Sequence, residues 1–256
     1  GCESLLDQGL SLLETELRRQ IFADGGHRER NPSLLLKLLS RFNHIRTLLM
    51  AAHVELPIEL QGAIDRVPPM VRAFRHGDGG LALFNGGFEE DRSLIDTVLA
   101  DTGVRGKALL GAPHSGFQRL AAGRTVIIVD AGRPSPTGGV NTHAGTLSFE
   151  MSVGKDRLVV NCGAPSSEGD HWFAAMQGTA AHSTLSVDDK NSTEFNLNGS
   201  FLTSPVNVEC SRKESDGSLW LETSHDGYRK NVGILHRRKF YLEASGEDFR
   251  GEDVIE

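Results

Sequence analysis

The sequence has no long hydrophobic run, although its 256 residues are 38% hydrophobic. A helix that crosses a membrane needs ~18 or more consecutive apolar residues. The longest clean apolar stretch, Thr125–Val129, has the length of a strand. We therefore expect no membrane span in this chain.

A secretion signal is also not visible at the start of the chain. The sequence opens with Gly1, Cys2 and Glu3, whereas a signal peptide begins with basic residues and continues into an apolar segment. This opening is typical of the middle of a helix. We therefore expect that the chain is a piece of a longer protein.

Cysteine pairs and excess positive charge are likewise missing. The three cysteines, Cys2, Cys162 and Cys210, lie far apart, which excludes a zinc ribbon and argues against a framework of disulfides. The net charge is -7, so the chain lacks the global basic field typical of proteins that bind nucleic acids. We expect no nucleic-acid partner.

The first hundred residues have the apolar spacing of amphipathic helices, with apolar side chains at every third or fourth position. Four helices are predicted, at about residues 4–23, 32–50, 57–75 and 91–100. Asn31 and Pro32 are suited to begin the second helix, as cap and first residue. Pro68 and Pro69 should kink or split the third helix.

After Gly103 the pattern changes to short strands separated by glycine turns. Strands are predicted at 117–122, 124–130, 147–153, 157–160, 185–187, 206–211, 219–222 and 233–243, with a hairpin turn at Asp216-Gly217. Strands and helices do not alternate, which argues against a Rossmann-type fold. The sequence thus predicts an α+β fold: a helical region over 1–105 and an antiparallel β-sandwich over 106–256.

A dense polar loop, 24–32 (DGGHRERNP), joins the first two helices. It carries His27, Arg28, Glu29, Arg30 and Asn31 directly after two glycines. A guanidinium group can bind a carboxylate through two hydrogen bonds, so this loop suits an anionic ligand. The alternative is a solvated loop with local ion pairs.

Three polar residues stand at the ends of predicted strands: His143, Asn161 and His182. If these strands are neighbours, two imidazoles and one amide oxygen would form a zinc set. An Asn amide is a poorer zinc ligand than a carboxylate. The alternative is that each side chain satisfies buried backbone groups, with no cofactor at all.

Hydrolase motifs are weak in this sequence. Ser224, His225 and Asp226 are consecutive, but a catalytic triad is a spatial arrangement and not a sequence run. The sequence also contains no G-x-S-x-G turn.

Taken together and in this order, several segments resemble the heparinase II/III-like family of polysaccharide lyases. They are 24–32 (DGGHRERNP), 142–150 (THAGTLSFE), 158–163 (LVVNCG), 179–184 (TAAHST) and 225–228 (HDGY). The resemblance covers about residues 20–250 and implies part of an α/α toroid followed by antiparallel sheets. It also implies a bacterial protein, with the periplasm and the cytoplasm both open as compartments and the oligomeric state undetermined.

The resemblance implies β-elimination on uronic-acid polysaccharides such as glycosaminoglycans or alginate. One group neutralises the uronate carboxylate, a base removes the C5 proton, and an acid protonates the leaving oxygen. Asn141 aligns with the family's catalytic His, and Leu34 stands where its Tyr is expected. His143, Asn161 and His182 align with residues that bind metal in some members.

Three functional hypotheses follow. In the first, the protein is a divergent lyase in which His27, Arg30, Asn141 and His143 form the catalytic site, while Arg28, Glu29 and Asn31 bind substrate. In the second, it is a catalytically inactive protein that binds anionic polysaccharide. In the third, it is a structural or interaction domain, because a fold does not fix a function.

Overall fold

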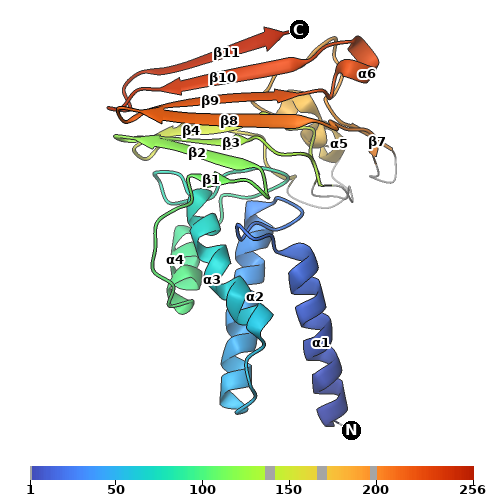
Figure 1. The fold of residues 1–256 in the computed structure, drawn as a ribbon, viewed down its shortest axis with the longest axis vertical. Coiled ribbons are helices and arrows are strands. Elements are labelled where there is room, and N and C mark those ends of the chain that lie inside the picture. The colour runs from blue at the N-terminus through green and yellow to red at the C-terminus, as the bar shows by residue number, and fades with distance from the viewer. Residues whose placement is uncertain (1, 136–141, 166–171, 197–200) are drawn as a thin grey trace.

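The computed structural model describes residues 2–135, 142–165, 172–196 and 201–256. Figure 1 shows three layers: a group of helices, an inner sheet beneath which they lie, and an outer sheet stacked on the inner one. The N-terminus lies at the far end of the helices and the C-terminus at the outer sheet. The predicted order of helices followed by an antiparallel sandwich is confirmed.

Four long helices form the first layer. They are α1 (Cys2–Gln20), α2 (Pro32–Ala51), α3 (Ile58–Ala73) and α4 (Arg92–Asp101). The Asn31 side chain accepts a hydrogen bond from the Leu34 N–H at 2.9 Å, which caps α2 as expected. Apolar side chains such as Leu39, Leu60 and Ile64 are fully buried between the helices.

Of the two expected effects of the prolines, a kink or a split, the split is wrong, because α3 runs through Pro68 and Pro69 as one helix. Their neighbours Val67, Met70 and Val71 are completely buried in the helical core. Tertiary packing of this face outweighs the unfavourable helix propensity of proline at these positions.

The inner sheet is antiparallel and is covered on both faces. Its order is β1 (Gly111–Ala112), β2 (Phe117–Ala122), β3 (Thr125–Asp130), β4 (Phe149–Val153) and β5 (Asp156–Val159). Along β3, Val126 and Ile128 pack against the helical core, whereas Ile127 and Val129 belong to the core between the sheets. Successive side chains of a strand point to opposite faces, so a strand between two cores is apolar throughout.

The outer sheet has the order β11 (Phe249–Ile255), β10 (His236–Leu242), β9 (Ser218–His225) and β8 (Val208–Ser215). The predicted hairpin turn is confirmed, because Ser215 pairs with Ser218 across Asp216 and Gly217. The inward side chains, Leu219, Leu221, Phe240 and Leu242, fill the core against β2 and β3.

Smaller elements lie between β5 and β8 in the chain: α5 (Phe173–Gln177), a 3₁₀ turn (Thr179–Ala181), and β6 (Glu194–Phe195) and β7 (Phe201–Thr203), which pair with each other. The short helix α6 (Arg229–Val232) connects β9 to β10 within the outer sheet. The strand expected at Leu185 and Val187 is wrong. The Leu185 carbonyl instead accepts a hydrogen bond from the Tyr228 hydroxyl at 2.7 Å, so this segment is a loop held by a side chain. The strand β11 was not predicted.

Candidate functional site

Three loops meet around Asn85, where the helices abut the inner sheet; we call this place the seam. The Asn85 side-chain amide donates to the Arg30 carbonyl at 3.0 Å, and the Asn31 amide donates to the Asn85 carbonyl at 2.8 Å. The His143 N–H lies 3.5 Å from Asn85 Oδ1, a long contact. The helical loop 24–32 and the β-region motif at His143 therefore lie together.

The backbone around Asn85 makes this meeting possible. Asn85 and Gly86 have positive φ angles of 51° and 70°, a conformation that asparagine and glycine tolerate best. A Cβ atom at Gly86 would lie 3.2 Å from His143 Nε2. A side chain at position 86 would therefore crowd the imidazole and would also be strained by the positive φ angle.

Arg30, a predicted carboxylate-binding residue, is bonded to other groups inside the protein. Its guanidinium group is ion-paired with Asp130, and its Nε donates to the Ser115 carbonyl at 2.8 Å. The group also lies over the Phe117 ring, 4.8 Å from the centroid, and only 6% of Arg30 is exposed. Burial raises the pKa of the Asp130 carboxyl, and the charge of Arg30 opposes this rise. A substrate would have to break this pair to reach Arg30.

His27 is also held by internal hydrogen bonds. Its Nδ1 accepts from the Glu29 N–H at 3.2 Å, so its Nε2 carries the proton and donates to Gln20 Oε1 at 2.9 Å. Burial lowers the pKa of His27, which favours this neutral form. The imidazole therefore fixes the loop on the end of α1. Arg28 and Glu29 are half-buried beside it.

His143 and His182 are brought together, with Nδ1 of the first 3.1 Å from Nε2 of the second. His182 Nδ1 donates to the Gly178 carbonyl at 2.8 Å, so its Nε2 is the acceptor and His143 Nδ1 is the donor. This assigns the lone pair of His143 to Nε2, the atom beside Gly86. Burial, and then the neighbouring His182, lower the pKa of His143 to about 3. Burial lowers the pKa of His182 to about 4.

Asn161 lies close to this pair but its amide is occupied. Its Nδ2 donates to Glu150 Oε1 at 3.0 Å, and its Oδ1 accepts from the Ser183 N–H at 3.2 Å. Across the ranges that the structure describes, no group of three or more His, Cys, Asp or Glu side chains could hold a metal ion. Two imidazoles and an occupied amide fall short of the four ligands of a structural zinc. Zinc at His143, Asn161 and His182 stays a prediction.

Catalytic residues are expected at positions 34 and 141, and the structure describes only the first of these positions. Leu34 lies half-buried in the first turn of α2, with its N–H bonded to Asn31. Asn141 lies outside the described residues. An apolar side chain at 34 can transfer no proton.

Asn85, Asp130 and the buried pair His76–Glu150 were not singled out in the sequence. His76 Nε2 lies 3.0 Å from Glu150 Oε2, and Glu150 Oε1 accepts from the Leu83 N–H at 2.9 Å. An Asn-Gly-Gly run at 85–87 is the one local signal that could have revealed the seam. The partners of the other residues lie far along the chain.

A buried network anchors the loops of the seam to the last strand. Arg238 donates to the Leu147 carbonyl at 2.9 Å and to the Ser183 carbonyl at 2.6 Å. The same guanidinium forms two bonds to Asp253 of β11, at 2.7 and 2.8 Å. Ser183 follows His182 directly, so one side chain connects the edge strand of the outer sheet with the histidine pair.

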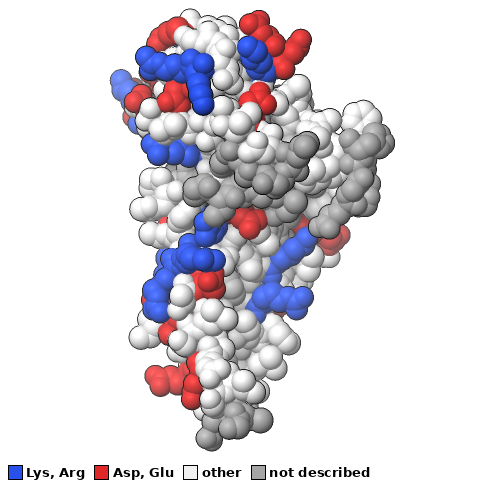
Figure 2. All heavy atoms as spheres, turned by 90° about the vertical axis from the view of Figure 1, so that its right-hand side faces the viewer, with Lys and Arg blue, Asp and Glu red and all other residues white. Residues whose placement is uncertain are grey.

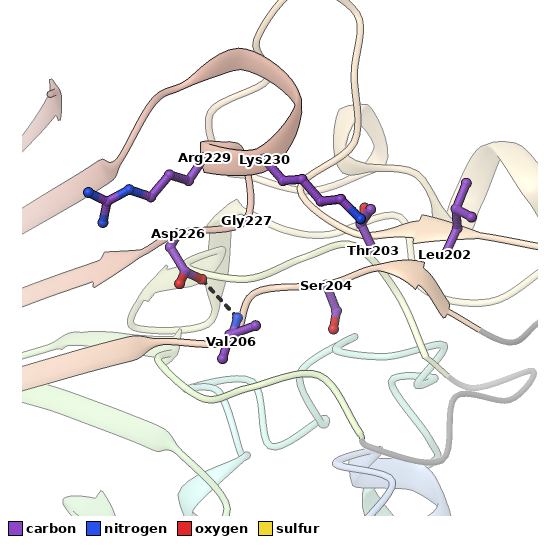
Figure 3. A pocket seen from close by; sticks show the side chains of 8 residues that line it. All are labelled: Leu202, Thr203, Ser204, Val206, Asp226, Gly227, Arg229 and Lys230. Carbon is purple, nitrogen blue, oxygen red and sulfur yellow. Dashed lines mark hydrogen bonds between the residues drawn. The ribbon is translucent and has the colours of Figure 1, made fainter.

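The consecutive Ser224, His225 and Asp226 do not form a triad. His225 Nδ1 accepts from the Gly227 N–H at 3.0 Å, and its Nε2 donates to His236 Nδ1 at 3.1 Å. Asp226 accepts from the Val206 N–H at 2.8 Å, as Figure 3 shows. His225 is thus bonded to His236 and not to Ser224.

A surface hollow of about 470 Å³ lies between β7 and α6 (Figure 3). Lys230 points towards Thr203 across it, while Arg229 points away. The Asp226 carboxylate on its wall is already bonded to the backbone and side chain of Asn207 as well as to Val206. The hollow therefore offers one cation and exposed apolar groups but no acid free for chemistry.

The surface charge is mixed on the face of the molecule that Figure 2 shows. On the face shown in Figure 2, basic and acidic side chains intermingle over the outer-sheet end. Among the described residues, no helix has both the length and the apolar character needed to cross a bilayer.

Comparison with known proteins shows the family of this chain. The model of the family described as heparinase II/III-like, C-terminal, matches residues 104–256. The chain belongs to the heparinase II/III-like family. This heparinase II/III-like chain is also 34% identical to FtsZ-localized protein C of Caulobacter vibrioides (strain NA1000 / CB15N), over 99% of its own length and 45% of that protein.

Solved structures of polysaccharide lyases share the fold. A crystal structure of heparinase III superposes with a TM-score of 0.78 at 15% identity, over 98% of this chain and 43% of the other. Heparan sulfate lyase HepC from Pedobacter heparinus gives 0.72 at 18% identity, over 96% and 40%. The chain spans less than half the length of these relatives, and such identities show the fold alone.

Proposed function

We propose that this heparinase II/III-like protein binds anionic, uronic-acid polysaccharide at the seam and does not cleave it by β-elimination. The proposal rests on the buried Arg30–Asp130 pair, which occupies the guanidinium that a uronate carboxylate would need. It selects the second of the hypotheses drawn from the sequence.

The remaining candidates are also poorly suited to proton transfer. Removal of the C5 proton is efficient when the pKa of the base is near the working pH. The pKa of His143 is lowered to about 3, and its Nδ1 is bonded to His182. His27 is bonded through both ring nitrogens, and Leu34 stands where a tyrosine is expected.

Two arginines beside these residues, with no ion pair in the described ranges, support binding of an anion. Arg28 is half-buried and Arg133 is exposed, and neither forms an ion pair within the described part of the chain. Arg133 follows Gly132, where a Cβ atom would lie 2.5 Å from the Arg30 guanidinium. Exposed His114 joins the same loop through its N–H, which donates to Asp24 at 2.8 Å. Carboxylate or sulfate groups would be favoured there.

The experiment titrates the protein with heparan sulfate, alginate and a neutral glucan, and follows absorbance at ~230 nm, where the unsaturated product of elimination absorbs. We expect binding of the anionic polymers with a flat absorbance trace. Arg28→Ala should weaken binding about fivefold, while Lys155→Ala, an exposed lysine in the β4–β5 turn, should not. Rising absorbance would show a lyase and overturn the proposal, as would the absence of binding to every polymer.

A second function is favoured by the relative with the higher sequence identity. FtsZ-localized protein C shares 34% identity over nearly the whole chain, whereas the lyases share 15–20%. We therefore propose, as the alternative, that the protein associates with polymers of FtsZ. Co-sedimentation with FtsZ assembled in the presence of GTP tests this; an unchanged supernatant fraction with and without polymers rejects it.

A further inference from the structure

The outer face of the outer sheet carries a row of four side chains that the seam does not involve. The strand register places Lys213 opposite Trp220, Trp220 opposite Tyr241 and Tyr241 opposite Arg250. Side chains directly opposite one another share a face of the sheet. The row therefore reads cation, aromatic, aromatic, cation across β8, β9, β10 and β11.

This row lies on the solvent side and not in the core. Alternate residues of the same strands, such as Leu221 and Phe240, fill the space between the sheets. Trp220 is 39% exposed, and Lys213 and Arg250 are exposed as well. The helices and the seam lie on the opposite side of the sandwich (Figure 1).

The two aromatic rings form a platform with polar ends. The Trp220 and Tyr241 ring centroids are 5.1 Å apart, and the Arg250 guanidinium lies 5.7 Å from the centroid of Tyr241. In the described ranges neither the indole N–H nor the phenol O–H has a hydrogen-bond partner. A buried tyrosine or tryptophan usually finds such a partner, so these two donors face water or a ligand.

A shallow hollow of about 310 Å³ adjoins the platform. Lys213, Trp220, Glu222 and Lys239 line it together with the edges of Ser211, Leu221 and Phe240. Lys239 is paired with Glu252 at 3.1 Å and Arg250 with Asp248, whereas Lys213 has no ion pair to any described residue. The hollow thus has an aromatic wall and one unpaired cation.

We infer that this row is a second binding site for an acidic saccharide, separate from the seam. The apolar C–H face of a sugar ring stacks on an aromatic side chain, and the hydroxyl groups at its rim accept bonds from the indole and phenol donors. Lys213, at one end, would bind the carboxylate or sulfate group of a neighbouring sugar unit. Arg250, at the other end, can do the same, because its pair with Asp248 is exposed to solvent and therefore weak, unlike the buried pair of Arg30.

The charge around the row favours a saccharide over a nucleic acid. A single-stranded nucleic acid also stacks on aromatic rings, but it needs a basic groove along its backbone. Here Glu222, Glu252 and Asp248 stand beside the platform. These acids would repel a nucleic acid, which carries a phosphate at every nucleotide. They would repel an acidic saccharide less, because its charged groups are further apart.

The experiment uses Trp220 as the reporter. The chain has two tryptophans, so Trp172→Phe leaves Trp220 as the only one. Fluorescence of this variant is titrated with a uronic-acid hexasaccharide, a neutral glucan hexasaccharide and a single-stranded oligonucleotide. We expect a saturable change with the acidic saccharide, which Lys213→Ala and Arg250→Ala each weaken about fivefold.

Matched variants separate this site from the seam. Arg28→Ala should leave the Trp220 signal unchanged, because Arg28 lies in the loop at the other side of the sandwich. If Trp172→Phe does not fold, calorimetric titration of the wild type and of Trp220→Ala with the acidic saccharide provides the same test. We expect two binding events in the wild type and only one in Trp220→Ala. No fluorescence change, equal binding of the neutral glucan, or tighter binding of the oligonucleotide would each overturn the inference.

Discussion

At the scale of single residues, the ion pair between Arg30 and Asp130 makes the sharpest prediction. Asp130→Asn keeps the shape of the side chain but leaves the guanidinium buried without a counter-charge. Breaking a buried pair in this way costs about 3–5 kcal/mol in the free energy of unfolding. Urea denaturation of wild type and variant measures the loss.

The matched control is the exposed pair Lys239–Glu252, which is 45% and 61% exposed. Glu252→Gln should cost less than ~1 kcal/mol, because solvent screens an exposed pair. Equal losses in the two variants would show that Arg30 does not depend on Asp130.

The buried imidazoles predict that stability falls as the pH falls below about 6.5. Burial lowers the pKa of His143 and His225 to about 3 and that of His182 to about 4, against an ordinary value of 6.5. Between these values the unfolded chain binds protons that the folded chain does not, so unfolding is favoured. At pH 5 the loss should be about 2 kcal/mol per histidine.

Urea midpoints measured at pH 7.5, 6 and 5 test this pH dependence. His225→Gln should reduce the slope, because it removes one of the buried imidazoles whose pKa is lowered. His44→Gln, at an exposed position of α2, is the matched variant that removes an imidazole outside the core. A stability that is flat from pH 7.5 to 5 would contradict the burial of these groups.

The residues that the sequence singles out lie near one another in the structure, but the sequence does not predict what they contact. His27, Arg30, His143 and His182 all lie in or beside the seam. Their partners are 85 to 100 residues away for Arg30 and 39 residues away for His143, so no local pattern reveals that these groups are already bonded. A sequence does not distinguish an arginine that is ion-paired within the protein from one that is available to a ligand.

At the scale of elements, local spacing predicted most of the fold. The four helices and the hairpin β8–β9 follow from apolar period and turn residues, which are local signals. The edge strand β11 was missed because its exposed residues lack alternation: FRGEDVI carries few apolar side chains. The strand β11 forms because it pairs with β10, and the sequence of β11 alone does not contain that information.

The start of α2 offers a prediction for a single element. Asn31 caps the helix and also donates to the Asn85 carbonyl, so Asn31→Ala removes two hydrogen bonds of a buried residue. Asp91 caps α4 at an exposed position. We expect a loss of about 2–3 kcal/mol in the free energy of unfolding for Asn31→Ala and a smaller loss for Asp91→Ala. Thermal unfolding of both variants decides, and a larger loss at Asp91 would contradict the double role of Asn31.

At the scale of the whole molecule, the layers share their cores. Phe117 and Ile128 of the inner sheet belong to the helical core, while Leu120 and Ile127 of the same strands belong to the core between the sheets. We therefore predict one cooperative transition. Far-ultraviolet circular dichroism, dominated by the helices, and tryptophan fluorescence, confined to residues 172 and 220, should give the same midpoint. Two separate midpoints would show independent domains.

The clamp formed by Arg238 has a practical consequence for anyone who handles the protein. Asp253, in the edge strand β11, holds the arginine that secures the Leu147 and Ser183 carbonyls beside the histidine pair. Shortening β11, or crowding it with an affinity tag, would therefore loosen groups in the middle of the chain.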